Sequence, residues 1–191
     1  MNNVSVVVVN WNGKHLLSAC LEGLRSQRYG SFATIVVDNG SIDGSVDFIK
    51  SSFPDVSVIA LPENLGFAAA NNLVIKTVDT NYIALLNNDA VPDPLWIEKL
   101  VEAMDRHPEA GIAASKMVFE EDRKTIDRAG DGYTTAGAAL LRGRGEPAER
   151  YDKPEWVFGA CAGAALYRTE MLRNIGLFDE DFFILYEDVD L

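Results

Sequence analysis

Residues 4–13 read VSVVVVNWNG, and this stretch decides the fold class. From Val4 to Val9 every residue except Ser5 is valine, which is typical of a strand buried on both faces of a parallel sheet. Polar residues follow at once, and Asn12-Gly13 is a dipeptide typical of turns. The stretch therefore predicts a central strand that ends in a polar loop.

The following residues alternate between short apolar runs and apolar residues at helical spacing. Strands that alternate with helices predict a mostly parallel sheet with helices on both faces, a Rossmann-like α/β fold. The strands we expect are residues 4–9, 34–37, 56–61, 82–86 and 111–118, and the helices are residues 14–27, 46–52, 67–78, 95–106 and 169–174.

The length of 191 residues fits one domain with two unlike parts. Residues 1–118 carry the alternating pattern. Residues 120–155 are rich in Gly, Arg and Pro and predict loops or short irregular strands inserted over one end of the sheet, and residues 157–167 return to a buried element.

Composition excludes several classes of protein. Because 48% of the residues are hydrophobic, the chain can bury a core and is not a disordered tail. A formal net charge of −12 argues against a nucleic-acid partner and against a basic membrane-surface protein. Half of that charge lies in residues 179–191, which hold six acids and no Lys or Arg.

The sequence carries no disulfide framework, zinc site or targeting signal. Cys20 and Cys161 have apolar neighbours and predict two buried thiols, while His15 and His107 are isolated. Neither a signal peptide nor an apolar run of spanning length is present. We expect a cytoplasmic location, with membrane contact at the inner face only through the acceptor or through a missing C-terminal region.

Each of the first four expected strands ends in polar side chains. In open α/β sheets, ligands bind beyond the carboxyl ends of the strands. Four polar ends along one edge therefore predict a cleft for a polar ligand. These ends are Asn10–Asn12, Asp38–Ser41, Glu63–Asn64 and Asn87–Asp89.

Residues 38–45 have three interpretations: a turn with a helix cap, a calcium loop, or a ligand site. The calcium loop is rejected, because its twelfth position is Lys50 where a bidentate Glu is required. As a ligand site, the segment gives Asp38 a hydrogen-bonding role toward a base or ribose. Further on, Asn71 and Asn72 are costly inside a helix, so their side chains need a partner in the backbone or a ligand.

Two acidic segments suit catalysis. Asp89 follows a buried strand and could cap a helix, or could hold Mg²⁺ or Mn²⁺ together with substrate phosphates. Near the end, acids flank the aromatic segment 182–186, whose apolar character predicts burial rather than a solvated face. A half-buried carboxylate among other acids has a raised pKa and can act as a general base.

The sequence resembles the family 2 inverting glycosyltransferases of the GT-A fold, in their bacterial rhamnosyltransferase-like branch. The resemblance covers nearly the whole chain, with five motifs in register. The motifs are VVNWNG (residues 8–13), VVDNGSIDGS (36–45), NLGFAAANN (64–72), LLNNDA (85–90) and GLFDEDFFILYEDVDL (176–191).

For the donor, the resemblance implies a nucleotide-sugar site in residues 1–118. Asp38 would bind the uracil or thymine base and the ribose, and Asp89 would meet Mg²⁺ or Mn²⁺ and the diphosphate. Asn87 replaces the first acid of the family's Asp-x-Asp motif and is a weaker metal ligand. The other donor residues would be Asn10, Asn12, Asn39, Asn64, Gly66, Phe67, Asn71 and Asn88.

For the acceptor, the resemblance implies a site in residues 119–191. Asp188 would be the catalytic base and Glu187 would support it. Gly163 and its small neighbours would lie beneath the acceptor, and Trp156 could stack on a sugar. Because family relatives continue past this motif, we expect a C-terminally truncated catalytic domain with an incomplete acceptor half.

The implied reaction moves a sugar from dTDP-rhamnose or a UDP-hexose to a glycan or polyprenyl-linked acceptor in cell-surface polysaccharide synthesis. A non-catalytic nucleotide-sugar-binding fragment stays open. A sugar-1-phosphate nucleotidyltransferase is less favoured, because residues 10–14 lack its Gly-rich, Arg-containing loop. A receiver-like signalling module would need acids after the first strand, where Asn10 stands.

Overall fold

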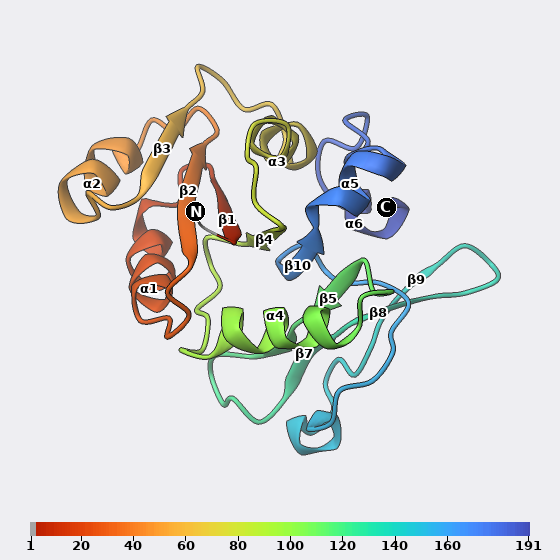
Figure 1. Cartoon of the computed structure of the whole chain (residues 1–191). Helices are drawn as coiled ribbons and strands as arrows, with labels where there is room; N and C mark the ends of the chain where they lie inside the picture. Colours follow the sequence, from red (N-terminus) through yellow and green to blue (C-terminus); the bar gives the residue numbers. More distant parts are fainter. Residues whose placement is uncertain (1–2) are drawn as a thin grey trace.

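The computed structural model describes residues 3–191 and is built around a six-stranded sheet with the order β3-β2-β1-β4-β10-β5 (Figure 1). Two small sheets, β6-β7 and β8-β9, accompany it. The strands are β1 (Val4–Asn10), β2 (Phe32–Asp38), β3 (Ser57–Ala60), β4 (Tyr82–Leu86), β5 (Ile112–Ala114), β6 (Lys116–Val118), β7 (Ile126–Ala129), β8 (Asp131–Tyr133), β9 (Ala139–Leu141) and β10 (Ala164–Arg168). The helices are α1 (Lys14–Arg25), α2 (Ser45–Ser52), α3 (Phe67–Ile75), α4 (Trp96–Arg106), α5 (Thr169–Ile175), α6 (Glu187–Asp190) and the 3₁₀ helix η1 (Ala148–Tyr151).

Strand β1 lies inside the sheet and is parallel to both neighbours. It pairs with β2 from Val4↔Phe32 to Asn10↔Asp38, and with β4 on its other side. Strand β3 continues the parallel arrangement beyond β2. Because parallel strands end at the same edge, the polar residues that follow β1, β2, β3 and β4 are brought to one side of the sheet.

Strand β10 runs antiparallel to both β4 and β5. Its first residue, Ala164, is opposite Leu86, the last residue of β4. The segment that precedes β10 therefore reaches the carboxyl edge of β4, and Asn87 N–H donates to the Gly163 carbonyl at 2.9 Å. The antiparallel direction of β10 therefore brings the segment that precedes it to the polar edge of the sheet.

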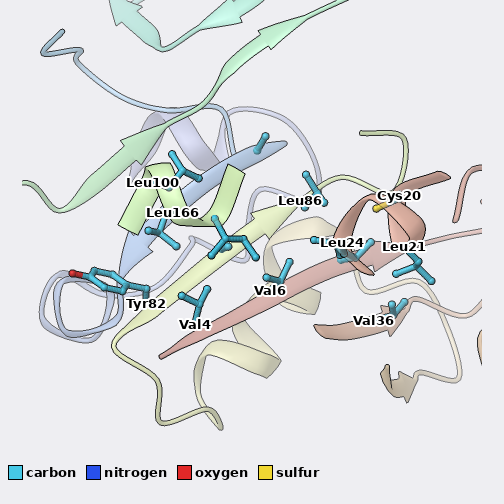
Figure 2. Packing of buried hydrophobic residues seen from close by; sticks show 14 of the residues in the cluster. Val4, Val6, Cys20, Leu21, Leu24, Val36, Tyr82, Leu86, Leu100 and Leu166 are labelled. Atoms are coloured by element: carbon cyan, nitrogen blue, oxygen red, sulfur yellow. The ribbon is translucent and has the colours of Figure 1, made fainter. Parts of the chain in front are cut away.

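Two apolar clusters hold helices against the sheet. Helices α1, α2 and α4 pack on one face and α3 and α5 on the other. The alternation along β1 explains the division, because Val6 joins the first cluster and Val7 the second. Figure 2 shows Val4 and Val6 of β1 in the first cluster, together with Leu21 and Leu24 of α1.

The alternating α/β order and the mostly parallel sheet predicted from the sequence are confirmed, with two differences. Residues 111–118 form two strands, β5 and β6, because the chain leaves the central sheet at Ser115 and β6 pairs with β7. The predicted burial of the aromatic segment is wrong for residues 183–186, whose side chains are 54–69% exposed. Within residues 3–191, no helix is long and apolar enough to cross a membrane.

Candidate active site

The ends of β1 and β2 form a buried polar pair. Asn10 and Asp38 are opposite each other in register and are both almost fully buried. Asn10 Nδ2 donates to Asp38 Oδ2 at 2.9 Å, and Ser41 N–H donates to Asp38 Oδ1 at 3.0 Å. Asp38 therefore has a hydrogen-bond donor on each carboxylate oxygen at the edge of the sheet.

Asn12 ties the loop after β1 to the loop after β2. Its backbone N–H donates to Ser41 Oγ at 2.8 Å, and its Oδ1 accepts from Ile42 N–H at 2.9 Å. Asn12 has a φ of 51°, a left-handed conformation that Asn tolerates better than most residues. Ser41, which the sequence analysis assigned no role of its own, connects Asn10 and Asn12.

The loop before α3 is shaped by Asn39 and Asn64. Asn39 Nδ2 donates to Asn64 Oδ1 at 2.8 Å, and Asn39 Oδ1 accepts from Leu65 N–H at 2.9 Å. Asn64 Oδ1 also accepts from Gly66 N–H at 2.9 Å. These two residues fix the path of the chain into α3, so any contact they make with a ligand comes in addition to a structural role.

At the start of α3, Gly66 and Phe67 meet the acidic C-terminal segment. Phe67 N–H donates to the Phe183 carbonyl at 2.7 Å. Gly66 has a φ of +88°, and a Cβ there would lie 2.5 Å from the Phe183 carbonyl oxygen, so glycine is required. One turn later, Asn71 Nδ2 donates to the Phe67 carbonyl, while its buried Oδ1 has no hydrogen-bond partner among the described residues.

The residues after β4 complete the polar edge. Asn88 Nδ2 donates to Asn10 Oδ1 at 2.8 Å, across the space left by Gly13. The thiol of Cys20 donates to the Asn87 carbonyl at 3.6 Å, and burial raises the pKa of that thiol to about 12. Asp89 is exposed beside this group.

These residues fit a divalent cation only in part. Within residues 3–191, no three His, Cys, Asp or Glu side chains lie close enough together to hold a metal. Asp89 supplies one exposed carboxylate, and Asn87 and Asn88 are half-buried amides. Such a set suits Mg²⁺ or Mn²⁺ bound jointly by one carboxylate and substrate phosphates, rather than a cation enclosed by protein ligands.

The Glu-Asp pair lies in α6 and reaches the same edge through the segment before β10. Asp188 Oδ2 accepts from Ala162 N–H at 3.0 Å. Glu187 is buried, its Oε2 has no hydrogen-bond partner among residues 3–191, and burial followed by the charge of Asp188 raises its pKa. Just before α6, Leu185 and Tyr186 have φ values of 73° and 70°, a strained backbone of the kind that clusters at functional sites.

The two predicted acceptor residues are placed differently. Gly163 lies beside β4, where a Cβ would be 3.0 Å from Asn87 Nδ2. Trp156 is 68% exposed and packs edge-on against His107, the residue after α4, at 5.2 Å between ring centroids. The structure therefore brings Gly163, but not Trp156, to the other predicted residues.

Sequence reasoning missed Asp131, whereas it predicted that Asn72 needs a partner in the backbone or a ligand. Asp131, in the region expected to be loops, is buried, and burial followed by the charge of Asp188 raises its pKa while Arg128 lowers it. An acid next to Gly130 was the only signal in the sequence, and it is a weak one. The partner of the Asn72 side chain is the backbone of Phe178. Asn72 Oδ1 accepts from Phe178 N–H at 3.1 Å, and Asn72 Nδ2 donates to the Phe178 carbonyl at 2.8 Å.

Sequence comparison finds a rhamnosyltransferase and a teichoic acid polymerase among the similar proteins. The chain is 26% identical to the N-acetylglucosaminyl-diphospho-decaprenol L-rhamnosyltransferase of Mycobacterium tuberculosis, over 97% of this chain and 68% of that protein. It is 32% identical to the teichoic acid poly(glycerol phosphate) polymerase of Staphylococcus epidermidis, over 47% of this chain and 13% of that protein.

Solved structures of glycosyltransferases share the fold. The mannosyltransferase PcManGT from Pyrobaculum calidifontis, in complex with GDP-Man and Mn²⁺, matches with a TM-score of 0.71 and 20% identity, over 97% of this chain and 49% of that chain. S. aureus TarS in complex with UDP matches with a TM-score of 0.69 and 20% identity, over 98% and 53%. This chain therefore spans about half the length of these structures, and its fold is the GT-A fold.

The family model "Glycosyl transferase family 2" matches residues 5–176. That range contains all of the central sheet except Val4, together with the polar edge and the segment before β10. The chain therefore belongs to glycosyl transferase family 2.

Proposed function

We propose that the chain is the catalytic domain of an inverting glycosyltransferase that uses a nucleoside-diphosphate sugar, dTDP-rhamnose or a UDP-hexose, as donor. Residues 1–118 form the donor half and residues 119–191 part of the acceptor half. The observation that carries the proposal is the meeting of the polar ends of β1, β2 and β4 with Asp188 at one edge of the sheet.

The donor half has the groups that a nucleoside diphosphate requires. Asp38, the residue proposed to bind the base or ribose, is held by Asn10 and Ser41 at the end of β2. Asn88 and Asp89 follow β4 and face the diphosphate. A Mg²⁺ or Mn²⁺ ion bound at Asp89 would neutralise charge on the departing diphosphate.

Asp188 has the position of a general base. Its Oδ2 accepts a hydrogen bond from Ala162 N–H, which leaves Oδ1 to receive a proton. The acceptor hydroxyl gives its proton to Asp188 and attacks the anomeric carbon, while the bond from that carbon to the diphosphate oxygen breaks with its electron pair. Because attack and departure occur on opposite faces, the anomeric configuration inverts and no protein nucleophile is needed.

The proposed acceptor is a glycan or a polyprenyl-linked sugar in cell-surface polysaccharide synthesis. Support comes from the names of the relatives, which include a rhamnosyltransferase with a decaprenol-linked acceptor and a teichoic acid polymerase. With a lipid-linked acceptor, the enzyme would work at the cytoplasmic face of the membrane.

The decisive experiment compares Asp188→Asn with Asp190→Asn in the full chain. Asp190 is an exposed acid in the same helix and serves as the matched control. Asp188→Asn should lower transfer by about 10²–10⁴-fold, since general-base catalysis contributes about that much, and should leave donor affinity within about twofold.

Transfer by Asp188→Asn at the rate of the control would overturn the assignment of the base. A wild-type chain that binds a nucleotide sugar but transfers nothing to any acceptor would instead identify a non-catalytic binding fragment. The donor itself is found by thermal shift with dTDP-rhamnose, UDP-glucose, UDP-galactose and UDP-N-acetylglucosamine in the presence of Mn²⁺.

A further inference from the structure

An exposed aromatic pair lies in the proposed acceptor half, outside the residues assigned so far. Tyr133 ends β8, and Phe158 lies in the segment before β10. Their rings are stacked, with centroids 5.7 Å apart and an interplanar angle of 11°. Tyr133 is 49% exposed and Phe158 is 69% exposed, so the outer faces of the two rings present a flat apolar surface to solvent.

The parallel arrangement distinguishes this pair. The other aromatic pairs among residues 3–191 meet edge-on, with interplanar angles of 69° to 83°. Edge-on packing turns the edge of one ring toward the face of the other and suits the interior, where Tyr167 meets Phe178 in this way. Two parallel rings at the surface keep open faces, and a contiguous exposed apolar surface is typical of a binding site.

Backbone contacts fix the place of the pair. Asp131 N–H donates to the Gly159 carbonyl at 2.9 Å, and Gly159 N–H donates back to the Asp131 carbonyl at 3.3 Å. Tyr133 is two residues after Asp131 and therefore lies on the same face of β8. A Cβ on Gly130 would lie 2.7 Å from Val157 Cγ1, so glycine permits the close approach of the two segments. The two rings thus extend from paired backbone.

The segment that carries Phe158 also leads to the proposed base. Gly159 follows Phe158, and three residues later Ala162 N–H donates to Asp188 Oδ2 at 3.0 Å. Four residues of extended chain span at most about 14 Å, so the pair lies within reach of an acceptor whose reacting end is at Asp188. Gly163, the predicted acceptor residue that the structure brings to the site, belongs to the same segment.

The two segments that carry the rings are uncharged. Residues 132–141 and 156–167 contain no Asp, Glu, Lys or Arg, so neither segment supplies a cation for a phosphate group. In residues 120–155 as a whole, nine acids outnumber seven Lys and Arg. An acidic excess does not attract an anionic membrane surface. The surface therefore suits an uncharged ligand with an apolar face.

A pyranose ring has both properties. Its C–H bonds form an apolar face, while the hydroxyl groups at its rim stay in water. The face of an aromatic ring carries partial negative charge, which attracts the weakly positive hydrogens of those C–H bonds. Tyr and Phe side chains also lose little conformational entropy on binding, because each has only two side-chain torsions.

We infer that Tyr133 and Phe158 form a stacking platform for a neutral sugar ring of the acceptor. This inference rests on the proposed function, which assigns a sugar-bearing acceptor to residues 119–191. The platform takes the role that the resemblance gave to Trp156, whose ring packs against His107 instead. The two rings make and break no bond; they hold the acceptor sugar while one of its hydroxyl groups meets Asp188.

The test measures the binding of neutral sugars by NMR, using the full chain with isotope-labelled phenylalanine. The chain is titrated with the methyl glycosides of N-acetylglucosamine, glucose, galactose and rhamnose. At least one of them should shift the ring signals of Phe158, which are identified by their absence in Phe158→Leu. If no glycoside moves these signals, the inference is wrong.

Three variants separate stacking from general apolar contact. Phe158→Leu keeps an apolar side chain but removes the flat ring, so the Kd of the glycoside should rise by about three- to tenfold. Tyr133→Leu tests the second ring in the same way and should also weaken binding. Phe158→Tyr keeps a ring at the position and should bind within about twofold of the wild type.

The matched control is Leu140→Ala in the same hairpin. Leu140 is 51% exposed and lies opposite Gly132, on the other face of the β8-β9 ribbon from Tyr133, so its variant should bind like the wild type. An equal Kd in Phe158→Leu and Leu140→Ala would contradict the platform. Binding of phosphatidylglycerol vesicles by the wild type, lost in Phe158→Leu, would assign the rings to a membrane surface and also refute it.

Glycoside binding is measured without donor and without transfer. A failed titration together with the expected loss of transfer in Asp188→Asn would therefore refute only the platform. Normal transfer by Asp188→Asn would instead refute the proposed base, whatever the glycosides do at Phe158.

Discussion

At the scale of single residues, the candidate site depends on side chains that hold one another in place. Asn10 is the centre of the donor side, because its amide group contacts Asp38 through Nδ2 and Asn88 through Oδ1. Both polar atoms of the Asn10 side chain are thus hydrogen-bonded within the protein. This arrangement leaves the more exposed Asp89 as the carboxylate that is available to a ligand.

Asp89→Ala should weaken metal-dependent nucleotide binding by at least about tenfold, which corresponds to a loss of about 1.4 kcal/mol. The physical reason is that a jointly bound cation loses its one nearby carboxylate. Calorimetry with UDP or dTDP, with and without Mn²⁺, measures the effect. Asp47→Ala, which removes an exposed acid on α2, should bind like the wild type, and an unchanged affinity in Asp89→Ala would remove Asp89 from the metal site.

Gly13→Ala should destabilise the chain by about 1–3 kcal/mol, the usual range for overpacking. A Cβ at this position would be 2.2 Å from Asn88 Nδ2 and 2.7 Å from Asn10 Oδ1, so the hydrogen bond between these two side chains would have to break. Urea denaturation gives the free energy of unfolding. Gly30→Ala is the control, because a Cβ there meets nothing within 4 Å, and equal stability of the two variants would contradict the prediction.

At the scale of elements, the contact between α3 and the segment that leads to α6 joins the two proposed halves. Asn72 binds both backbone groups of Phe178 and also donates to Glu180 Oε1 at 2.9 Å. Phe67 N–H binds the carbonyl of Phe183 a few residues further along the segment. The position of the Glu-Asp pair therefore depends on a helix of the proposed donor half.

Asn72→Ala should lower the free energy of unfolding by about 2–3 kcal/mol, because the buried N–H and carbonyl of Phe178 lose their partner. Transfer should fall more than donor affinity, since the loosened segment carries Asp188. Urea denaturation and acceptor kinetics measure the two effects. The control is Lys76→Ala, which removes only an exposed ion pair with Glu180 and should change the free energy of unfolding by less than about 1 kcal/mol. An equal loss of stability in both variants would show that Asn72 does not hold the segment in place.

The parallel strands and the helices between them could be predicted from the sequence. The antiparallel pairing of β10 could not. The valine run of β1 and the helical spacing of α1 and α4 are local patterns, and the structure confirms both. The pairing of β10 with β4 and β5 depends on contacts between distant residues, which periodicity does not record. Asp131 escaped notice for the same reason: its backbone pairs with Gly159, which lies much later in the sequence.

The exposed aromatic segment shows a different limit. Apolar composition predicted burial of residues 183–186, yet their side chains are more than half exposed in the described structure. The backbone explains the outcome, since the Phe183 carbonyl is fixed by Phe67 and the left-handed conformations of Leu185 and Tyr186 turn the chain sharply into α6. Local geometry here overrides the tendency of apolar side chains to be buried.

At the scale of the whole molecule, the buried acids make stability depend on pH. The raised pKa values of Glu187 and Asp131 mean that the folded chain holds protons which the unfolded chain releases. Stability should therefore fall as pH rises, in a window that opens at the ordinary values of 4.5 for Glu and 3.8 for Asp. Glu180 has a lowered pKa and the opposite effect, but its exposed position makes that effect small.

Glu187→Gln should flatten this dependence, because a neutral side chain has no proton to release. Urea denaturation of the wild type and the variant from pH 4 to pH 7 measures it, and the variant should gain stability relative to the wild type toward pH 7. Glu170→Gln, an exposed acid in α5, is the control and should keep the wild-type slope. A variant whose slope equals that of the wild type would show that Glu187 has an ordinary pKa in the folded chain.

The reversed strand β10 also affects the order in which the molecule can be assembled. It lies between β4 and β5, although β5 leaves the ribosome about fifty residues before β10 does. During synthesis, β4 and β5 are therefore made before the strand that lies between them. The six-stranded sheet is complete only when β10 pairs with both. Because the Glu-Asp pair follows β10 in the chain, the proposed base is synthesised only after β10 and after every strand of the proposed donor half.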